Sequence, residues 1–190
     1  MVARGNHDRH HPYAYAYAQV PGNGVFYSFR YGPVFVVALD TQAPPAHVPE
    51  RINQQDFLEA ALSSDDAQSA AFRIVTFHQS PFSNAMHNEA YGHAGARENW
   101  VPLLSAYNVD MVISGHYHNY QRGELDGVTY VIIGGGGSNL LFGADNFWEH
   151  MTEIQHVWHY AVMDVAEQTL TWTVRDIEDA VIDTVVLSSQ

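Results

Sequence analysis

Short runs of apolar residues, each followed by a polar or glycine-containing segment, recur along the chain. The runs at 72–77, 109–113 and 128–133 are rich in β-branched or aromatic residues, which predicts buried strands. Further strands are predicted over 25–31, 34–39, 158–165, 169–175 and 181–187. A Gly-Pro pair joins the first two of these as a hairpin, and the last three alternate apolar and polar residues as an antiparallel meander does.

Two helices are predicted among these strands. Asn53 can cap a helix over 53–62, which has an apolar face. A second helix is predicted over 98–107, where Pro102 is tolerated only in the first turn. Strand–helix–strand pieces followed by a meander predict one α/β domain of the α+β type over residues 1–190, with two sheets packed face to face and helices outside.

Glycine marks two connections. A turn is predicted over 123–127, between two strand-like segments. Four consecutive glycines, 134–137, follow the strand at 128–133 without the lysine that a nucleotide-cradling loop requires. Because glycine lets backbone approach another group closely, this run is either a tight passage near a functional site or a flexible loop.

Polar side chains with metal-binding chemistry stand where predicted strands end. The segment 115–118 reads Gly-His-Tyr-His, His78 directly follows the run at 72–77, and 5–8 reads Gly-Asn-His-Asp. Neutral imidazole is the commonest protein metal ligand, and a strand end is a rigid support for it. His116 and His118 are expected to project from one side of an extended chain. By itself such a pair is equally compatible with two loop histidines.

In this order, three segments resemble the motifs of the calcineurin-like metallophosphoesterases, and within them the purple-acid-phosphatase-like branch. The segments are GNHD at 5–8, VTFHQSPF at 75–82 and GHYHNYQR at 115–122. The resemblance implies a four-layer αββα sandwich of two packed mixed sheets with the site at the strand ends. It also implies a dinuclear centre of Mn, Fe or Zn, which activates a hydroxide to hydrolyse a phosphate monoester or diester.

The same resemblance assigns roles to individual side chains. Asn6, His78 and His116 are implied ligands of one metal, and His118 is an implied ligand of the other. His7 is the implied catalytic histidine, which contacts the substrate and stabilises or protonates the leaving group.

Two neighbouring residues have open roles. Asp8 is a catalytic candidate that could hold the imidazole of His7 in one tautomer, or it could shape the loop. Arg122 could contact a substrate phosphate or pair with one of the many acidic side chains. Tyr120 is predicted to pack rather than to act chemically.

One feature of the family pattern is missing. The family begins with an Asp-x-His or Asp-x-Gly motif and then a Gly-Asp whose aspartate bridges the metals. Here GNHD begins at residue 5, and no Gly-Asp pair occurs in the chain. The chain is therefore predicted to lack the first βαβ unit, to bind one metal or none, and to hydrolyse esters poorly by itself. A non-catalytic scaffold with a degenerate site, or a half-site completed by another chain or an oligomer, are the alternatives.

Charge and composition limit the partners. Eight basic and twenty-one acidic residues give a net charge of −13, which argues against nucleic acid or an anionic membrane as a partner. A small phosphate ester remains compatible, because bound metals supply local positive charge. The absence of cysteine excludes disulfides and thiol catalysis, and no apolar run approaches the roughly 20 residues of a membrane span.

Overall fold

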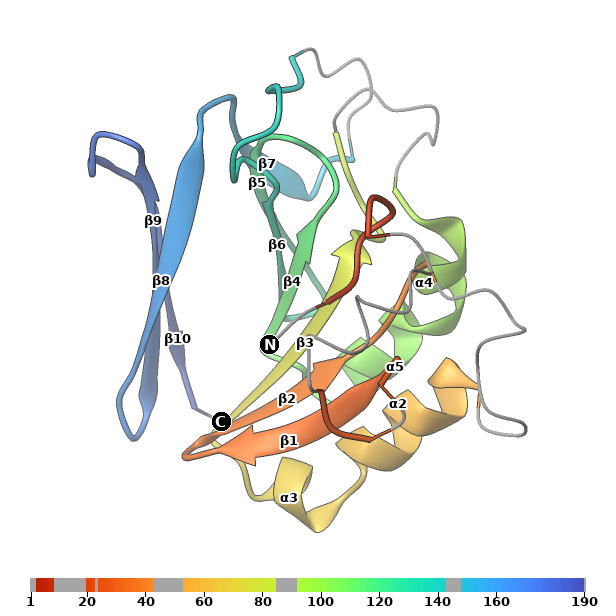
Figure 1. Cartoon of the computed structure of the whole chain (residues 1–190). Coiled ribbons are helices and arrows are strands. Elements are labelled where there is room, and N and C mark those ends of the chain that lie inside the picture. Colours follow the sequence, from red (N-terminus) through yellow and green to blue (C-terminus); the bar gives the residue numbers. More distant parts are fainter. Residues whose placement is uncertain are drawn as a thin grey trace.

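The computed structural model describes residues 3–8, 20–22, 24–42, 53–84, 92–142 and 148–189. Two sheets form the framework (Figure 1). The larger sheet has the order β1-β2-β3-β4-β6-β5-β7, and the smaller has the order β10-β9-β8. Their strands are β1 (Tyr27–Tyr31), β2 (Val34–Ala38), β3 (Phe72–Gln79), β4 (Met111–Gly115), β5 (Tyr120–Leu125), β6 (Val128–Ile133), β7 (Met151–Gln155), β8 (His159–Val165), β9 (Thr169–Asp176) and β10 (Val181–Ser188). The middle parts of the loops around 9–19 and 85–91 lie outside the described residues.

Four short helices are described: α2 (Gln54–Leu62), α3 (Asp65–Gln68), α4 (Ala94–Asn99) and α5 (Val101–Ala106). The predicted cap is present, since the Asn53 side chain accepts a hydrogen bond from the Asp56 backbone N–H at 2.8 Å. The single helix predicted over 98–107 is instead the pair α4 and α5, because Pro102 has no N–H to continue the ladder and lies in the first turn of α5. None of the described helices has the length and apolar character needed to cross a membrane.

The larger sheet is mixed, with a parallel centre. β2, β3, β4 and β6 run parallel, while β1, β5 and β7 join antiparallel. β5 and β7 were not predicted, and the expected turn over 123–127 is mostly strand. At Gly123 an added Cβ would lie 2.3 Å from the backbone oxygen of His150, so this glycine permits the close approach of β7 rather than ending a strand.

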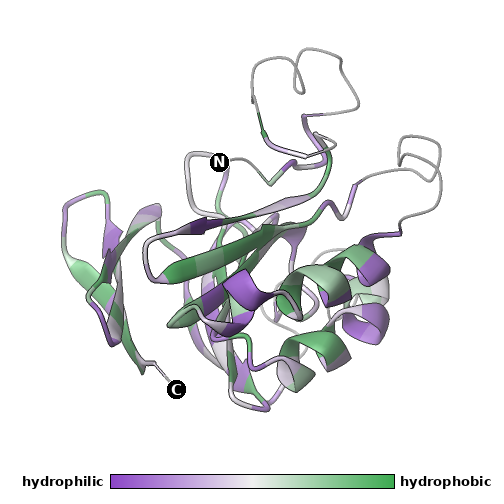
Figure 2. Cartoon of the chain, turned by 90° about the horizontal axis from the view of Figure 1, so that it is seen from below, coloured by the Kyte–Doolittle hydropathy of each residue, from purple (hydrophilic) through white to green (hydrophobic). Residues whose placement is uncertain are grey.

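The strand β3 contributes to both cores of the molecule. Val75 and Phe77 pack in the cluster between the larger sheet and the helices, and Phe72 and Ile74 pack in the cluster between the two sheets. Each face of the larger sheet is thus covered, which explains its nearly continuous apolar strands. Figure 2 shows these central strands coloured mostly hydrophobic, whereas the helices carry both hydrophobic and hydrophilic residues.

The predicted sandwich of two packed sheets is confirmed. Helices cover the outer face of the larger sheet, and the smaller sheet covers its other face (Figure 1). The described residues place no helix on the outer face of the smaller sheet, so three of the four implied layers are present. The physical reason is its topology: β8, β9 and β10 are antiparallel neighbours joined by short turns, whereas parallel strands need crossover segments that are usually helices.

A polar contact joins the two sheets. Tyr120 and Arg122 of β5 both donate to the carboxylate of Asp183 in β10, at 2.6 Å from Tyr120 Oη and 2.6 Å from Arg122 Nε. Arg122 therefore pairs with an acid, which decides between its two predicted roles. Tyr120 is fully buried, as its predicted packing role requires. Burial acts to raise the pKa of Asp183, but the hydrogen bonds from Arg122 and Tyr120 outweigh it and lower that pKa.

We expect Asp183→Asn to destabilise the fold by about 1–3 kcal/mol at neutral pH, because it removes a charged acceptor shared by two donors. The pKa of Asp183 is lowered by folding, so its stabilisation is present above the ordinary value of 3.8 and is lost as pH falls through the lower folded value. Urea unfolding of the variant and the parent chain should therefore differ at about pH 7, and the difference should shrink as the pH is lowered below 3.8. Asp164→Asn, at an exposed position of β8, is the control; a pH-independent difference for Asp183→Asn would contradict the assignment.

Candidate metal site

The candidate site forms where two parallel strands end side by side. His78 is the penultimate residue of β3, and His116 directly follows Gly115, the last residue of β4. Because β3 and β4 are parallel neighbours, these two ends share one edge of the sheet. The loop 3–8 lies against the same edge, near the arrowhead of β3 in Figure 1, and brings Asn6 to it.

Three side-chain atoms converge at this edge. Asn6 Oδ1 lies 2.8 Å from His78 Nε2, His78 Nε2 lies 3.1 Å from His116 Nδ1, and His116 Nδ1 lies 3.3 Å from Asn6 Oδ1. We call these three atoms the three-donor cluster. They come from positions 6, 78 and 116, so segments far apart in sequence meet at one point.

The cluster depends on an unusual backbone conformation at His116. This residue has a φ of 69°, in the left-handed region that residues other than glycine rarely occupy. The chain bends tightly here, as Tyr117 N–H donates to the Gly115 carbonyl and Asn119 N–H to the Tyr117 carbonyl, both at 2.8 Å. The expectation that His116 and His118 project from one side of an extended chain is therefore wrong. Backbone conformations of this kind concentrate at functional sites, where surrounding structure holds them.

Asp8 shapes the loop that carries Asn6. Its carboxylate accepts a hydrogen bond from the Gly5 backbone N–H at 2.7 Å, and its own N–H donates to the Gly5 carbonyl at 3.1 Å. Gly5 lies directly against His78: an added Cβ would be 2.8 Å from the imidazole Cε1. The loop-shaping alternative for Asp8 is thus supported by a contact, while its influence on the tautomer of His7 stays a prediction.

His118 is oriented by a contact of its own. Its Nδ1 lies 2.9 Å from the backbone oxygen of Asn139, and since a carbonyl can only accept, Nδ1 carries the proton. The lone pair is therefore on Nε2, which is the arrangement typical of a metal-binding imidazole. The segment after β6 is further attached by the Leu141 N–H, which donates to the His118 carbonyl at 2.9 Å.

The surroundings favour the neutral form of His78. Burial lowers the pKa of His78; the carboxylate of Asp8 opposes this, and His7 and His118 lower the pKa further. A neutral imidazole is the form that offers a lone pair to a metal. These influences also show that His7 and His118 lie close enough to His78 to act on its charge.

The donor set fits a transition metal. Donors that share one ion, with bond lengths of about 2.0–2.2 Å, lie about 3 Å apart, as the three-donor cluster atoms do. Two imidazoles and an amide oxygen suit Mn, Fe or Zn better than Mg or Ca. Within the described ranges no three His, Cys, Asp or Glu side chains gather in a metal-binding group, and the third atom of the three-donor cluster is an amide oxygen.

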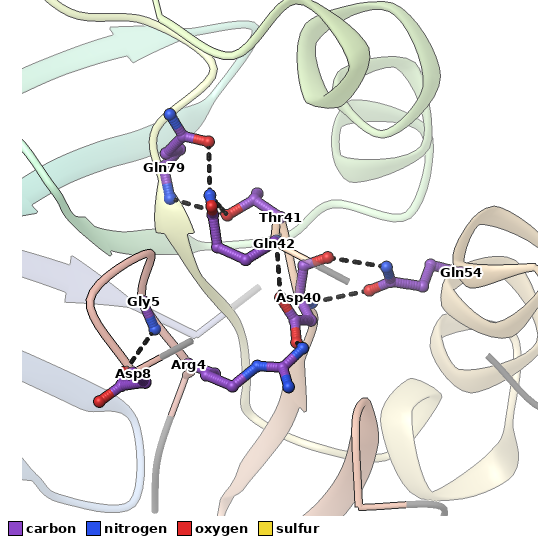
Figure 3. Close-up of polar contacts among 8 residues, drawn as sticks. All are labelled: Arg4, Gly5, Asp8, Asp40, Thr41, Gln42, Gln54 and Gln79. Atoms are coloured by element: carbon purple, nitrogen blue, oxygen red, sulfur yellow. Dashed lines mark hydrogen bonds and ion pairs between the residues drawn. The ribbon is translucent and has the colours of Figure 1, made fainter. Parts of the chain in front are cut away.

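Sequence reasoning did not single out Gln79, which is buried beside the cluster. Its amide nitrogen lies 3.3 Å from His116 Nε2, and its amide oxygen accepts a hydrogen bond from Gln42 at 2.7 Å. Figure 3 shows Gln42 and Gln79 joined at the end of β2 and β3. The signal that could have identified it is the alternation along β3, in which Val75 and Phe77 are buried and Gln79 stands at the next position on the same side.

A second set of buried amides supports the segment after His118. Gln121 donates to Asn119 Oδ1 at 2.9 Å and to Ser83 Oγ at 3.1 Å, and it accepts from the Asn84 backbone N–H at 2.8 Å. Asn119 and Gln121 are fully buried. These contacts attach the loop after β3 to β5, and they account for two polar residues of the GHYHNYQR segment that have no predicted chemical role.

The four glycines at 134–137 divide into two pairs. An added Cβ at Gly134 would lie 1.8 Å from the Tyr117 carbonyl oxygen, and one at Gly135 would lie 2.3 Å from the His159 ring. At Gly136 and Gly137 nothing lies within 4 Å of such an atom. The first pair is the tight passage beside the site, and the second pair is unconstrained by packing.

Comparisons with known proteins agree with this geometry. A family model described as calcineurin-like phosphoesterase matches residues 1–120. Purple acid phosphatase 18 of Arabidopsis thaliana is 29% identical over 73% of this chain and 36% of its own length. Probable inactive purple acid phosphatase 27 of the same plant is 27% identical over 74% of this chain and 29% of its own length.

A solved purple acid phosphatase has a similar fold. The purple acid phosphatase PPD1 of yellow lupin (Lupinus luteus) superposes with a TM-score of 0.74 at 24% identity, covering 86% of this chain and 32% of that one. At this identity the likeness concerns the fold. The chain spans about a third of the length of the curated relatives it matches.

Proposed function

Because the chain belongs to the calcineurin-like phosphoesterase family, in its purple-acid-phosphatase-like branch, we propose that the three-donor cluster binds a transition metal that serves the hydrolysis of phosphate esters. The observation that supports this most directly is the convergence of Asn6 Oδ1, His78 Nε2 and His116 Nδ1 at the shared end of β3 and β4. The proposed substrate is a small phosphate ester, since a net charge of −13 disfavours a nucleic acid.

Each side chain has a proposed task. Asn6, His78 and His116 hold one ion, and His118 offers Nε2 to a second. Bound metal polarises the phosphoryl oxygens and lowers the pKa of a coordinated water. His7, exposed next to Asn6, donates a proton to the leaving oxygen of the ester. The Asp8–Gly5 turn holds the segment from which Asn6 and His7 extend.

The site of this chain is incomplete for two-metal chemistry. One metal has three protein donors, but His118 is the sole donor proposed for the second, which is too few for tight binding, and no Gly-Asp aspartate is present to bridge two ions. We therefore expect the isolated chain to hydrolyse esters poorly or not at all, compared with a full-length purple acid phosphatase assayed in parallel.

The test is hydrolysis of a chromogenic phosphate monoester and a diester by the 190-residue chain loaded with Mn, Fe or Zn. The expected result is slow turnover or none. Any turnover should require metal, disappear in His78→Ala and persist in His150→Ala, which changes a half-exposed histidine paired with Glu149. Turnover as fast as that of the full-length purple acid phosphatase would refute the proposal that the metal site of this chain is incomplete. Turnover that survives metal removal or His78→Ala would refute the metal site itself.

A non-catalytic scaffold is the second candidate. It is favoured by the missing Gly-Asp motif and by a relative whose name includes "probable inactive". A metal-loaded chain without any turnover, whose His116→Ala variant keeps its stability and its partner binding, would support the scaffold. The third candidate, a half-site completed by another chain, predicts a metal content that rises only when the protein oligomerises.

A further inference from the structure

Gln79 connects one ligand candidate to the next. It directly follows His78 at the end of β3, it is 6% exposed, and its carboxamide faces the Nε2 edge of the His116 ring. The opposite edge of that ring, Nδ1, belongs to the three-donor cluster. The hydrogen bond between Gln79 and Nε2 therefore influences which tautomer of His116 faces the cluster.

A neutral imidazole carries one proton, on either of its two nitrogens. For His116 Nδ1 to give its lone pair to a metal, Nε2 must carry the proton and must find an acceptor. Gln79 is the side chain placed to accept it, because its amide lies 3.3 Å from Nε2. The carboxamide has an acceptor and a donor of nearly the same shape, so a half-turn exchanges them within the same space.

We propose that Gln79 is the positioning residue of His116: its amide oxygen accepts the Nε2 proton and so leaves Nδ1 free to bind metal. This inference rests on the proposed metal site. With the amide nitrogen toward Nε2, as in the structure, the proton of His116 lies instead on Nδ1, where Asn6 Oδ1 at 3.3 Å can accept it. Metal binding is thus coupled to a half-turn of the Gln79 amide.

One neighbour of Gln79, the carboxamide of Gln42, can follow that half-turn. Gln42, which now donates to Gln79 Oε1 at 2.7 Å, is also a carboxamide and can present its oxygen instead. Backbone contacts stay unchanged, since the Gln79 N–H donates to Thr41 Oγ1 at 3.1 Å and the Gln42 N–H donates to Asp40 Oδ1 at 2.6 Å. The path of these contacts at the end of β2 is visible in Figure 3.

The same contacts attach the loop that carries Asn6. Asp40 is buried and forms an ion pair with Arg4, two residues before Asn6, while the Gln54 side chain brackets the Asp40 backbone at 2.7 and 2.8 Å. Figure 3 shows this group of side chains beside the Gly5–Asp8 turn. Gln79 therefore belongs to a fixed support rather than to a mobile surface, as a positioning role requires.

Two substitutions distinguish a Gln79 that accepts the His116 Nε2 proton from one that only fills space. Gln79→Glu keeps an oxygen for the His116 Nε2 proton and a second oxygen for Gln42, whereas Gln79→Leu keeps neither. We expect Gln79→Leu to weaken Zn or Co(II) binding, measured by competition with a chelator, by roughly 10- to 100-fold. Gln79→Glu should bind at least as tightly as the parent chain. Gln68→Leu, which removes the amide of an exposed residue in α3 that donates to the Leu62 carbonyl at 2.8 Å, is the control.

A spectroscopic measurement identifies the tautomer. Long-range ¹H–¹⁵N spectra should show the His116 proton on Nε2 in Gln79→Glu even without metal, and the parent chain should move to that tautomer on adding Zn. Two results would overturn the role of Gln79 but not the proposed function. The first is a metal affinity in Gln79→Leu equal to that of the parent chain. The second is Gln79→Glu binding metal as weakly as Gln79→Leu, although both variants melt at the same temperature. A parent chain that binds no metal would overturn this role and the proposed function together.

Discussion

Replacing His116 by alanine is expected to abolish the metal binding of this chain. The parent chain should bind close to one Mn, Fe or Zn per molecule, because one cluster of three donors is present and His118 alone cannot hold a second ion tightly. Removing Nδ1 of His116 leaves an amide oxygen and one imidazole, so the affinity should fall by roughly 100-fold or more, beyond the effect of losing an outer hydrogen bond. Elemental analysis of dialysed, metal-loaded protein measures the stoichiometry.

The comparison needs a histidine that lies outside the site. His150→Ala changes a side chain that is 41% exposed and stacks edge-on with Trp148, so it should leave the metal content unchanged. A nearly full metal content in His116→Ala would contradict the proposed ligand set. Two metals per parent chain, both lost in His116→Ala, would mean that further ligands replace the missing bridging aspartate and that efficient hydrolysis is within reach of this chain.

Gly134→Ala is expected to cause the largest loss of stability among Gly→Ala substitutions in the described part of the chain. The new Cβ would lie 1.8 Å from the Tyr117 carbonyl oxygen and 2.6 Å from its carbon, and both belong to backbone that a rotamer change cannot move. Relief requires β6 and the 116–119 bend to separate, which breaks the Gly134 N–H bond to the Asn119 carbonyl at 3.2 Å. The cost should be about 3 kcal/mol or more, measured by urea unfolding.

The control stands two residues away in the same glycine run. An added Cβ at Gly136 meets nothing within 4 Å, so Gly136→Ala should change the free energy of unfolding by less than about 0.5 kcal/mol. The Cβ added at Gly134 would also lie 3.3 Å from the Cα of His118, so the same pair of variants tests the position of His118. Equal stability of the two variants would show that the strand and the bend are not held in contact in solution.

Much of the strand framework was predictable because local pattern and burial agree along it. The runs at 72–77 and 128–133 are strands in the structure, and the closing meander is present as β8, β9 and β10. β5 and β7 escaped prediction because Gly123 looks like a turn residue, although in the sheet it is required by close backbone contact with His150. Local propensity cannot report a contact between residues that are distant in sequence.

The sequence by itself determined the chemistry that is available to this protein. The order of its motifs indicates the family, and those motifs contain the four candidate ligands Asn6, His78, His116 and His118. The absence of a Gly-Asp pair is also read from the residues alone, and it predicts that the chain binds one metal or none.

Only the tertiary structure decided how those residues meet. It joins Asn6, His78 and His116 within 3.3 Å of one another, gives His116 its left-handed backbone, and turns His118 toward Asn139. It also assigns Arg122 to Asp183 rather than to a substrate, and it reveals Gln79 beside the cluster. These facts depend on the pairing of parallel strands and on buried polar contacts between distant segments, and such contacts leave no periodic signal in a single sequence.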